Sequence, residues 1–219
     1  MNTLALGLYA EGRTDERFLP AIIKQTVEYI LRKHDRIDIE ILDLMLIKPP
    51  SHCSNRAESI LYAARETSGY HALIVHSDAD DRDYKQTRKE LFDPGVALIQ
   101  QEQADVCRDL IPIIPVRMVE AWMLADPEAL QRVLKTTVQV LGLPGKAQLV
   151  ERDSNPKDTL KFIIQRVYPH QSRYWNRIRG ELYGRLAPEM SLDRLRQVAS
   201  YKQFLDDLTA TLKILNLIQ

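Results

Sequence analysis

The sequence lacks any apolar run long enough to cross a membrane. A spanning helix needs about 18 or more consecutive apolar residues, and charged side chains interrupt every apolar stretch of this chain well before that length. The first residues also lack the basic-then-apolar pattern of a secretion signal, so we expect no signal peptide. Both absences predict a protein that does not enter a membrane.

Cysteine is scarce, with only Cys53 and Cys107 among 219 residues. Their spacing fits neither a metal site nor a disulfide framework. His52 precedes Cys53, but with no second ligand pair close by we expect no metal there. A chain without disulfides suits a reducing compartment, and we expect it in the cytoplasm.

An excess of one charge sign is also lacking, because 30 basic residues balance 30 acidic ones. The balance is uneven along the chain. Residues 1–140 hold 17 basic and 22 acidic side chains, whereas residues 141–219 hold 13 and 8. This asymmetry predicts an acidic site next to a surface suited to polyanions, although a solvated helical face would give a similar count.

Short apolar runs of strand length recur along the first part of the chain. They cover residues 4–10, 37–46, 72–75 and 111–117. The second run alternates apolar with acidic residues, which indicates a strand near an edge. Helical periodicity lies between the runs, beginning near Asp15 or, because of Pro20, near Leu19, then over 56–66 and in two pieces around a turn within 84–103. The alternation predicts an α/β fold, a Rossmann-like and mostly parallel sheet flanked by helices.

The sequence pattern changes after residue 140. Gly142-Leu143-Pro144-Gly145 interrupts the regular secondary structure that we expect on either side. Helical patterns follow from Pro156, over residues 173–186, after Ser191 and over residues 204–218. We therefore expect two domains, an α/β domain of residues 1–140 and a helical C-terminal extension of residues 141–219 packed on it.

Acidic residues follow several of the predicted strands. Glu11 comes after the first strand, Asp78 and Asp80 after the third, and Glu120 soon after the fourth. Ligands of open α/β sheets bind beyond the carboxyl ends of the strands. Carboxylates gathered there repel one another, and a divalent cation relieves that repulsion. The pattern predicts a pocket with Glu11, Asp78 and Asp80 inside it and Glu120 on its rim.

Each of these residues also has a purely structural interpretation. The acidic turn could be solvated, Glu11 could stabilise a helix N-terminus, and Glu120 could pair with Arg117. We expect three neighbouring acids to be solvated, namely Asp15, Asp81 and Asp83. We expect His76 to be a packed strand residue and Trp122 to belong to the core.

Two stretches, Tyr9-Ala10-Glu11-Gly12-Arg13-Thr14-Asp15 and Val75-His76-Ser77-Asp78-Ala79-Asp80, resemble the Toprim domain of primases, topoisomerases and overcoming-lysogenization-defect (OLD) nucleases. Three further segments resemble a Toprim-like bacterial family, domain of unknown function 4276. They are Arg117–Asp126, Asn155-Pro156-Lys157 and Ser200-Tyr201-Lys202-Gln203-Phe204. Members of that family are often encoded beside ATPases in phage-defence settings.

The resemblance implies a set of metal ligands and an activity. Glu11, Asp78 and Asp80 match the Toprim acidic triad, and Glu120 matches the further acid of the nuclease-like members. Oxygen ligands suit Mg²⁺ or Mn²⁺, which stabilise the attacking and leaving oxygens of phosphodiester hydrolysis. We expect no appended domain of the size that supplies a strand-breaking tyrosine, and no primase template-binding module. The expected function is therefore a Mg²⁺- or Mn²⁺-dependent nuclease or phosphoryl-transfer component.

Nucleic acid, either DNA or RNA, is the expected partner. Lys157, Arg177 and Arg179 are the candidate contacts to its phosphates. A second hypothesis is a non-catalytic Toprim module that binds a metal ion and partners or regulates an ATPase encoded nearby. The balanced net charge favours a protein that depends on a partner, because tight binding to nucleic acid usually needs an excess of Lys and Arg. A third, a nucleotide-sugar transferase using Asp-x-Asp with Mn²⁺, fits the Glu11-Gly12 turn less well.

Overall fold

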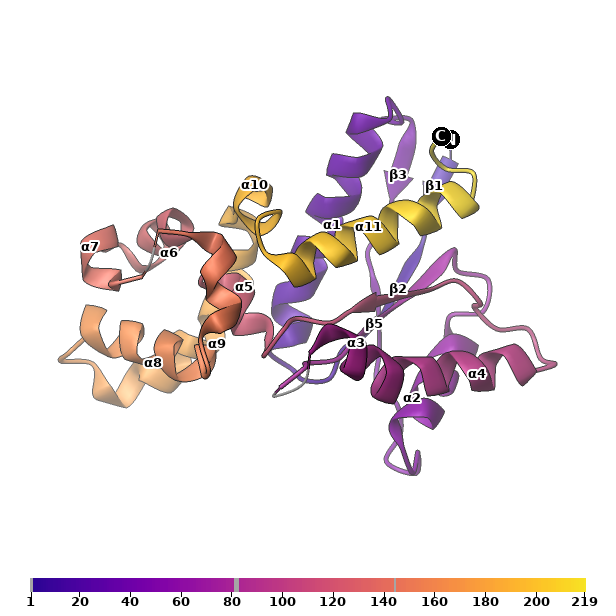
Figure 1. The fold of residues 1–219 in the computed structure, drawn as a ribbon, viewed down its shortest axis with the longest axis horizontal. Helices are drawn as coiled ribbons and strands as arrows, with labels where there is room; N and C mark the ends of the chain where they lie inside the picture. Colours follow the sequence, from indigo (N-terminus) through magenta and orange to yellow (C-terminus); the bar gives the residue numbers. More distant parts are fainter. Residues whose placement is uncertain (1, 81–82, 144) are drawn as a thin grey trace.

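The centre of the fold is a parallel sheet of four strands in the order β4-β2-β5-β6. It is described by a computed structural model that covers residues 2–80, 83–143 and 145–219. Figure 1 shows helices on both sides of the sheet and a second group of helices beside it. The strands are β2 (Leu6–Tyr9), β4 (Met45–Ile47), β5 (Ala72–His76) and β6 (Leu110–Ile113).

Two further strands form a small sheet of their own. β1 (Asn2–Leu4) and β3 (Ile39–Ile41) pair in parallel, just before β2 and β4 along the chain. The predicted strand of residues 37–46 is therefore two short strands, β3 and β4, separated by residues 42–44. Its expected place near an edge is confirmed.

Side chains of the strands alternate between two hydrophobic cores. Leu8 and Ile74, which are register partners in β2 and β5, face one core, whereas Tyr9 and Val75 face the other. All residues of β2 and β5 are buried. Burial on both faces is why these strands read as continuous apolar runs rather than alternating patterns.

Helices from distant parts of the sequence cover the two faces. α1 (Asp15–Lys33) and α11 (Ala199–Ile214) contribute to the first core, and α11 packs against β6 and α1. The other face carries α2 (Arg56–Glu66), α3 (Tyr84–Thr87), the π-helical segment η1 (Arg88–Phe92) and α4 (Asp93–Gln101). The expected α/β class, with a parallel sheet between helices, is confirmed.

The second group of helices lies beside the sheet, at the left of Figure 1. Trp122 of α5 is fully buried, packs edge-on against Tyr201 of α11 with ring centroids 5.3 Å apart, and donates a hydrogen bond to Ser200. The predicted core role of Trp122 is confirmed. The group comprises α5 (Val119–Met123), α6 (Pro127–Leu134), α7 (Val138–Leu141), η2 (Ala147–Arg152), α8 (Pro156–Val167), η3 (Ser172–Tyr174), α9 (Trp175–Leu186), η4 (Ala187–Glu189) and α10 (Leu192–Leu195).

Three predicted boundaries need correction. α1 begins at Asp15 and accommodates Pro20 inside the helix, where the proline leaves one carbonyl of the first turn without its usual N–H donor. A π-helical segment, not a turn, precedes Pro94, so the chain stays helical there. The last helix begins at Ala199 rather than Phe204. Among the described helices, none has the length and apolar character that a membrane span requires.

Candidate metal centre at the strand ends

The strand order reverses between β2 and β5. The chain leaves β2 through α1 toward β4 on one side, and it leaves β5 through α3 and α4 toward β6 on the other. The crevice outside the carboxyl ends at such a switch point is where open α/β sheets bind ligands. Glu11 follows β2 and Asp78 follows β5, so both acids border this crevice.

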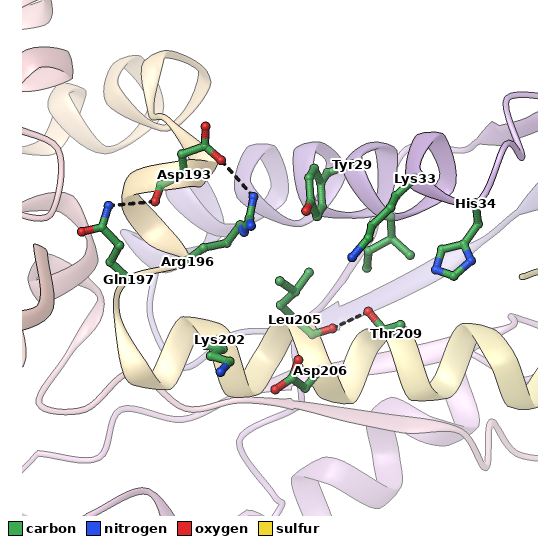
Figure 2. Close-up of a pocket in the computed structure, with 11 residues that line it drawn as sticks. Tyr29, Lys33, His34, Asp193, Arg196, Gln197, Lys202, Leu205, Asp206 and Thr209 are labelled. Carbon is green, nitrogen blue, oxygen red and sulfur yellow. Dashed lines mark hydrogen bonds and ion pairs between the residues drawn. The ribbon is translucent and has the colours of Figure 1, made fainter. Parts of the chain in front are cut away.

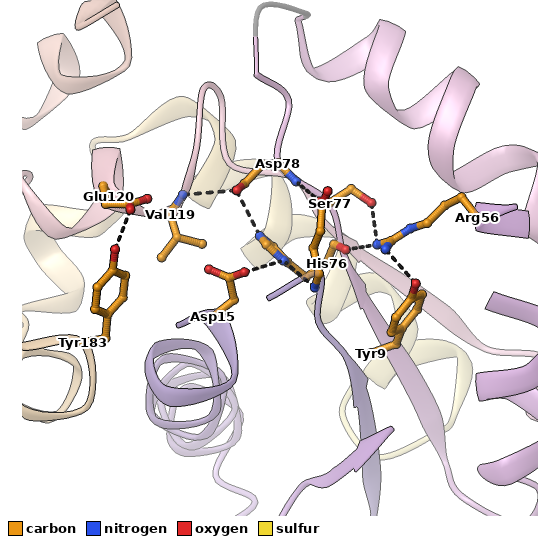
Figure 3. A network of polar contacts seen from close by, with 10 residues as sticks. Tyr9, Asp15, Arg56, His76, Ser77, Asp78, Val119, Glu120 and Tyr183 are labelled. Carbon is orange, nitrogen blue, oxygen red and sulfur yellow. Dashed lines mark hydrogen bonds and ion pairs between the residues drawn. The ribbon is translucent and has the colours of Figure 1, made fainter. Parts of the chain in front are cut away.

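Hydrogen bonds join the two strand ends directly. The backbone N–H of Asp78 donates to Glu11 Oε2 at 3.1 Å, and Asp78 Oδ1 accepts the backbone N–H of Val119 at 3.2 Å (Figure 3). The ends of β2 and β5 and the first turn of α5 are thus held together. This geometry places the Glu11 carboxylate next to the Asp78 backbone, while a single pocket for the carboxylates of Glu11, Asp78 and Asp80 stays a prediction.

His76, the last residue of β5, orients the Asp78 carboxylate through its ring. Its ring is completely buried, with Nε2 3.2 Å from Asp78 Oδ1 and Nδ1 accepting the Glu11 N–H at 3.4 Å. These contacts select the tautomer that carries its proton on Nε2. Burial favours a lower pKa for His76, but the hydrogen bond to Asp78 and the charges of Asp78, Asp15 and Glu11 outweigh it and raise the pKa.

Asp15 lies in the first turn of α1, and the prediction that it is solvated is wrong. It is 6% exposed rather than solvated, and its Oδ2 lies 3.8 Å from His76 Nδ1. Burial raises its pKa to about 6, the His76 charge opposes that rise, and the charges of Asp78 and Glu120 add to it. Asp15, His76 and Asp78 each present a ligand atom within 4.8 Å of the others.

Glu120 lies in the same electrostatic environment but has its own partner. It is 5% exposed, and its carboxylate accepts a short hydrogen bond from the hydroxyl of Tyr183 on α9. Burial, the Glu120 charge and this hydrogen bond raise the pKa of Tyr183 far above its usual range. Figure 3 shows Glu120 and Tyr183 across from Asp15 and Asp78.

An arginine that the sequence analysis did not single out clamps the other side of the strand ends. Arg56, at the start of α2, donates to Tyr9 Oη at 2.8 Å and to Ser77 Oγ at 2.8 Å, and also bonds the carbonyl of His76. Its guanidinium lies over the Tyr9 ring, 4.3 Å from the centroid. Arg56 directly follows the helix cap Asn55, which accepts the N–H of Glu58, but nothing in the neighbouring sequence indicates its contacts with the strand ends.

The remaining candidate residues lie farther from this group. Asp80 is exposed, adopts a left-handed backbone with φ of 51°, and its N–H donates to the carbonyl of Arg117 at 2.8 Å. In the described part of the chain, the donor group consists of Asp15, His76 and Asp78, so it does not include Asp80. Asp83 caps α3 by accepting the Gln86 N–H, and Asp81 falls outside the described residues.

The candidate nucleic-acid contacts are all on the second group of helices. Lys157 is exposed in the first turn of α8, after the cap Asn155, and Arg177 is exposed on α9. Arg179 is half-buried on the same helix as Tyr183. Arg179 therefore shares α9 with Tyr183, whose hydroxyl bonds the Glu120 carboxylate.

The donor set at the switch point fits a hard divalent cation. Asp15 and Asp78 would offer carboxylate oxygens, which Mg²⁺ and Mn²⁺ prefer. Among the described residues, Glu11 lies outside the group of close donor atoms, although its carboxylate accepts the Asp78 N–H. In the arrangement described, both nitrogens of His76 are engaged, so His76 orients a ligand rather than supplying one. Burial is the main cause of the raised pKa of Asp15, and the charges of Asp78 and Glu120 add to it.

A groove of about 500 Å³ lies elsewhere, between the C-terminal end of α1 and α10–α11 (Figure 2). It presents Lys33 and Lys202 together with Asp206, while Arg196 is already paired with Asp193 at 2.9 Å. The opposite charges largely balance, and Asp15 is at the other end of α1. The groove lacks the convergence of acids seen at the strand ends.

The profile of the family described as Domain of unknown function (DUF4276) matches residues 10–209. The chain belongs to this family. The match includes Glu11, Asp78 and Glu120 as well as α8 and α9. Comparisons with curated proteins and with solved structures gave no match.

Proposed function

We propose that the protein is a Mg²⁺- or Mn²⁺-dependent phosphodiesterase that acts on nucleic acid. The observation that carries this proposal is the hydrogen bond between Glu11 and the Asp78 backbone at the switch point of the sheet. It brings two acids from separate strands to the crevice where ligands of this architecture bind. The resemblance to Toprim nucleases of the OLD type supports the same activity.

The surrounding residues suit the chemistry of phosphodiester cleavage. A bound divalent cation supplies positive charge to the reacting phosphate and to the oxygens that attack and leave. Glu11, Asp15 and Asp78 would hold that cation through oxygen atoms. His76 fixes the orientation of Asp78, and Tyr183 fixes that of Glu120, so these carboxylates stay in place during the reaction.

The test is cleavage of single- and double-stranded DNA and RNA by the purified chain with Mn²⁺ or Mg²⁺. We expect Glu11→Ala, Asp15→Ala and Asp78→Ala each to lower the rate by orders of magnitude, since each removes charge that positions the cation. Asp43→Ala is the matched control, because Asp43 is an exposed acid outside this group. Equal cleavage by Glu11→Ala and the wild type would indicate a contaminating nuclease.

A second candidate is a non-catalytic Toprim module that binds the cation and regulates an ATPase partner in a phage-defence system. Two observations favour it: the net charge of the chain is zero, and the donor group within the described residues leaves out Asp80. Tight autonomous binding to nucleic acid usually rests on excess Lys and Arg. Cation binding without cleavage, alone or with the ATPase, would select this candidate.

A further inference from the structure

The surface formed by α8, η3 and α9 is basic although the chain as a whole is neutral. Between Lys157 and Arg185 there are 7 Lys or Arg and only 2 Asp or Glu. Two aromatic side chains on this surface are exposed, Phe162 at 59% and Tyr174 at 44%. Cations interleaved with accessible aromatic rings are typical of surfaces that bind single-stranded nucleic acid.

A pocket of about 320 Å³ opens within this surface, between α8 and α9. Its lining includes the cations Lys161 and Arg179, the hydrogen-bonding side chains Ser172 and Asn176, and the ring of Trp175. Trp175 donates its Nε1–H to the carbonyl of Tyr168 at 2.9 Å, which fixes the ring. The pocket thus combines positive charge, polar donors and a rigid aromatic wall.

The pocket borders the acidic residues through α9. Arg179 and Tyr183 are four positions apart on this helix and therefore share one of its faces. The Arg179 charge acts on the Tyr183 hydroxyl, and that hydroxyl bonds Glu120. The charge of Arg179 and the hydrogen bond of Tyr183 thus link the pocket to the buried Glu120 carboxylate.

We propose that this pocket binds the nucleotide next to the scissile phosphate in single-stranded nucleic acid. Lys161 and Arg179 contact its phosphate, and Trp175 contacts its base. An unpaired base is required, because the bases of a duplex are stacked on one another and cannot lie on a protein ring. The position of the nucleotide next to the scissile phosphate rests on the proposed function. Binding of the nucleotide itself requires no cleavage.

The test is binding of a fluorescein-labelled, 5′-phosphorylated oligothymidylate in EDTA, followed by anisotropy over a range of salt concentrations. We expect Lys161→Ala and Arg179→Ala each to weaken binding and to reduce the salt slope by about 0.7, the value for one phosphate contact on a single strand. Trp175→Ala should weaken binding about fivefold or more, since a stacked base contributes about 1–3 kcal/mol.

Intrinsic fluorescence locates the ligand, because the chain has two tryptophans and Trp122 is fully buried. Unlabelled oligothymidylate should quench the wild type but not Trp175→Phe. Arg32→Ala is the matched control, an arginine on α1 whose side chain is 72% exposed, and we expect it to bind as the wild type does. Circular dichroism shows whether each variant is folded. Lys161→Glu reverses a charge on the surface, so we expect it to weaken binding without changing the fold.

Binding and cleavage separate the two proposals. Wild-type affinity and salt slope in both Lys161→Ala and Arg179→Ala would overturn the pocket assignment, even if the protein cleaves nucleic acid. No binding by the wild type at low salt, or equal affinity for a blunt duplex, would overturn it too. Binding that these variants lose, in a protein that never cleaves, would keep the pocket and refute the nuclease.

Discussion

The carboxylate of Glu11 accepts a hydrogen bond from the backbone N–H of Asp78 at 3.1 Å. This contact joins residues 67 positions apart and depends on β2 and β5 being neighbours in the sheet. The side chain of Asp78 is oriented separately, by His76 and by the N–H of Val119. Two acids from separate strand ends are thereby held near each other, beside the buried ring of His76.

Such a group should respond strongly to a divalent cation. Mn²⁺ or Mg²⁺ at 100 times its dissociation constant stabilises the folded state by about 2.7 kcal/mol, which raises the melting temperature of a chain of this size by roughly 5–10 °C. We expect Asp78→Asn to abolish the rise while slightly stabilising the cation-free protein. Thermal denaturation with and without millimolar Mn²⁺ measures this, with Asp43→Asn as control. An identical response of Asp78→Asn and wild type would mean that these acids are not a metal site.

The raised pKa of Asp15 predicts a pH dependence of stability without cation. Because the folded-state pKa is about 6 against a usual 3.8, the folded protein binds this proton more tightly than the unfolded chain does. The stabilisation is complete below pH 4 and is lost as the pH rises to 6, on the order of 3 kcal/mol in total.

Urea denaturation of the wild type and of Asp15→Asn across this range is the measurement. We expect the free energy of unfolding of Asp15→Asn to exceed that of the wild type at pH 7 and the difference to shrink toward pH 4. Asp43→Asn should show no such trend. A difference between Asp15→Asn and wild type that is independent of pH would contradict the raised pKa.

Tyr183 supplies a hydrogen bond to the buried carboxylate of Glu120. Tyr183→Phe leaves that carboxylate without this donor, and we expect a loss of about 1–3 kcal/mol in the free energy of unfolding. Tyr174→Phe is the matched control, since Tyr174 is 44% exposed. A loss as small as that of the control would show that Glu120 does not depend on Tyr183.

Gly95 of α4 packs against Ile60 of α2. A Cβ at this position would lie 2.7–2.8 Å from three atoms of the buried Ile60 side chain. We expect Gly95→Ala to destabilise the protein by about 1–3 kcal/mol through overpacking. Gly145→Ala, where an added Cβ meets nothing within 4 Å, should change little. Chemical denaturation measures the free energy of unfolding of both variants. Equal free energies would mean that α2 and α4 move apart at little cost to make room for the added Cβ.

Much of the fold was predictable because its signals are local. α2 and α8 span residues 56–66 and 156–167, as predicted, since each begins after an asparagine that caps it. The strand ends with Glu11 and Asp78 were also visible as acids after apolar runs. The burial of Asp15 and the clamp by Arg56 were not, because both depend on how helices meet at the switch point rather than on neighbouring residues.

The packing of α11 against β6 and α1 has a consequence for synthesis. During translation, the strands and α1 leave the ribosome long before residues 199–214 do, so the part of the sheet at β6 that α11 covers stays exposed while about 90 more residues are added, at roughly 5–20 residues per second. Several seconds pass in which apolar strand residues face solvent or a chaperone. Folding of the sheet during synthesis therefore ends only when α11 has emerged.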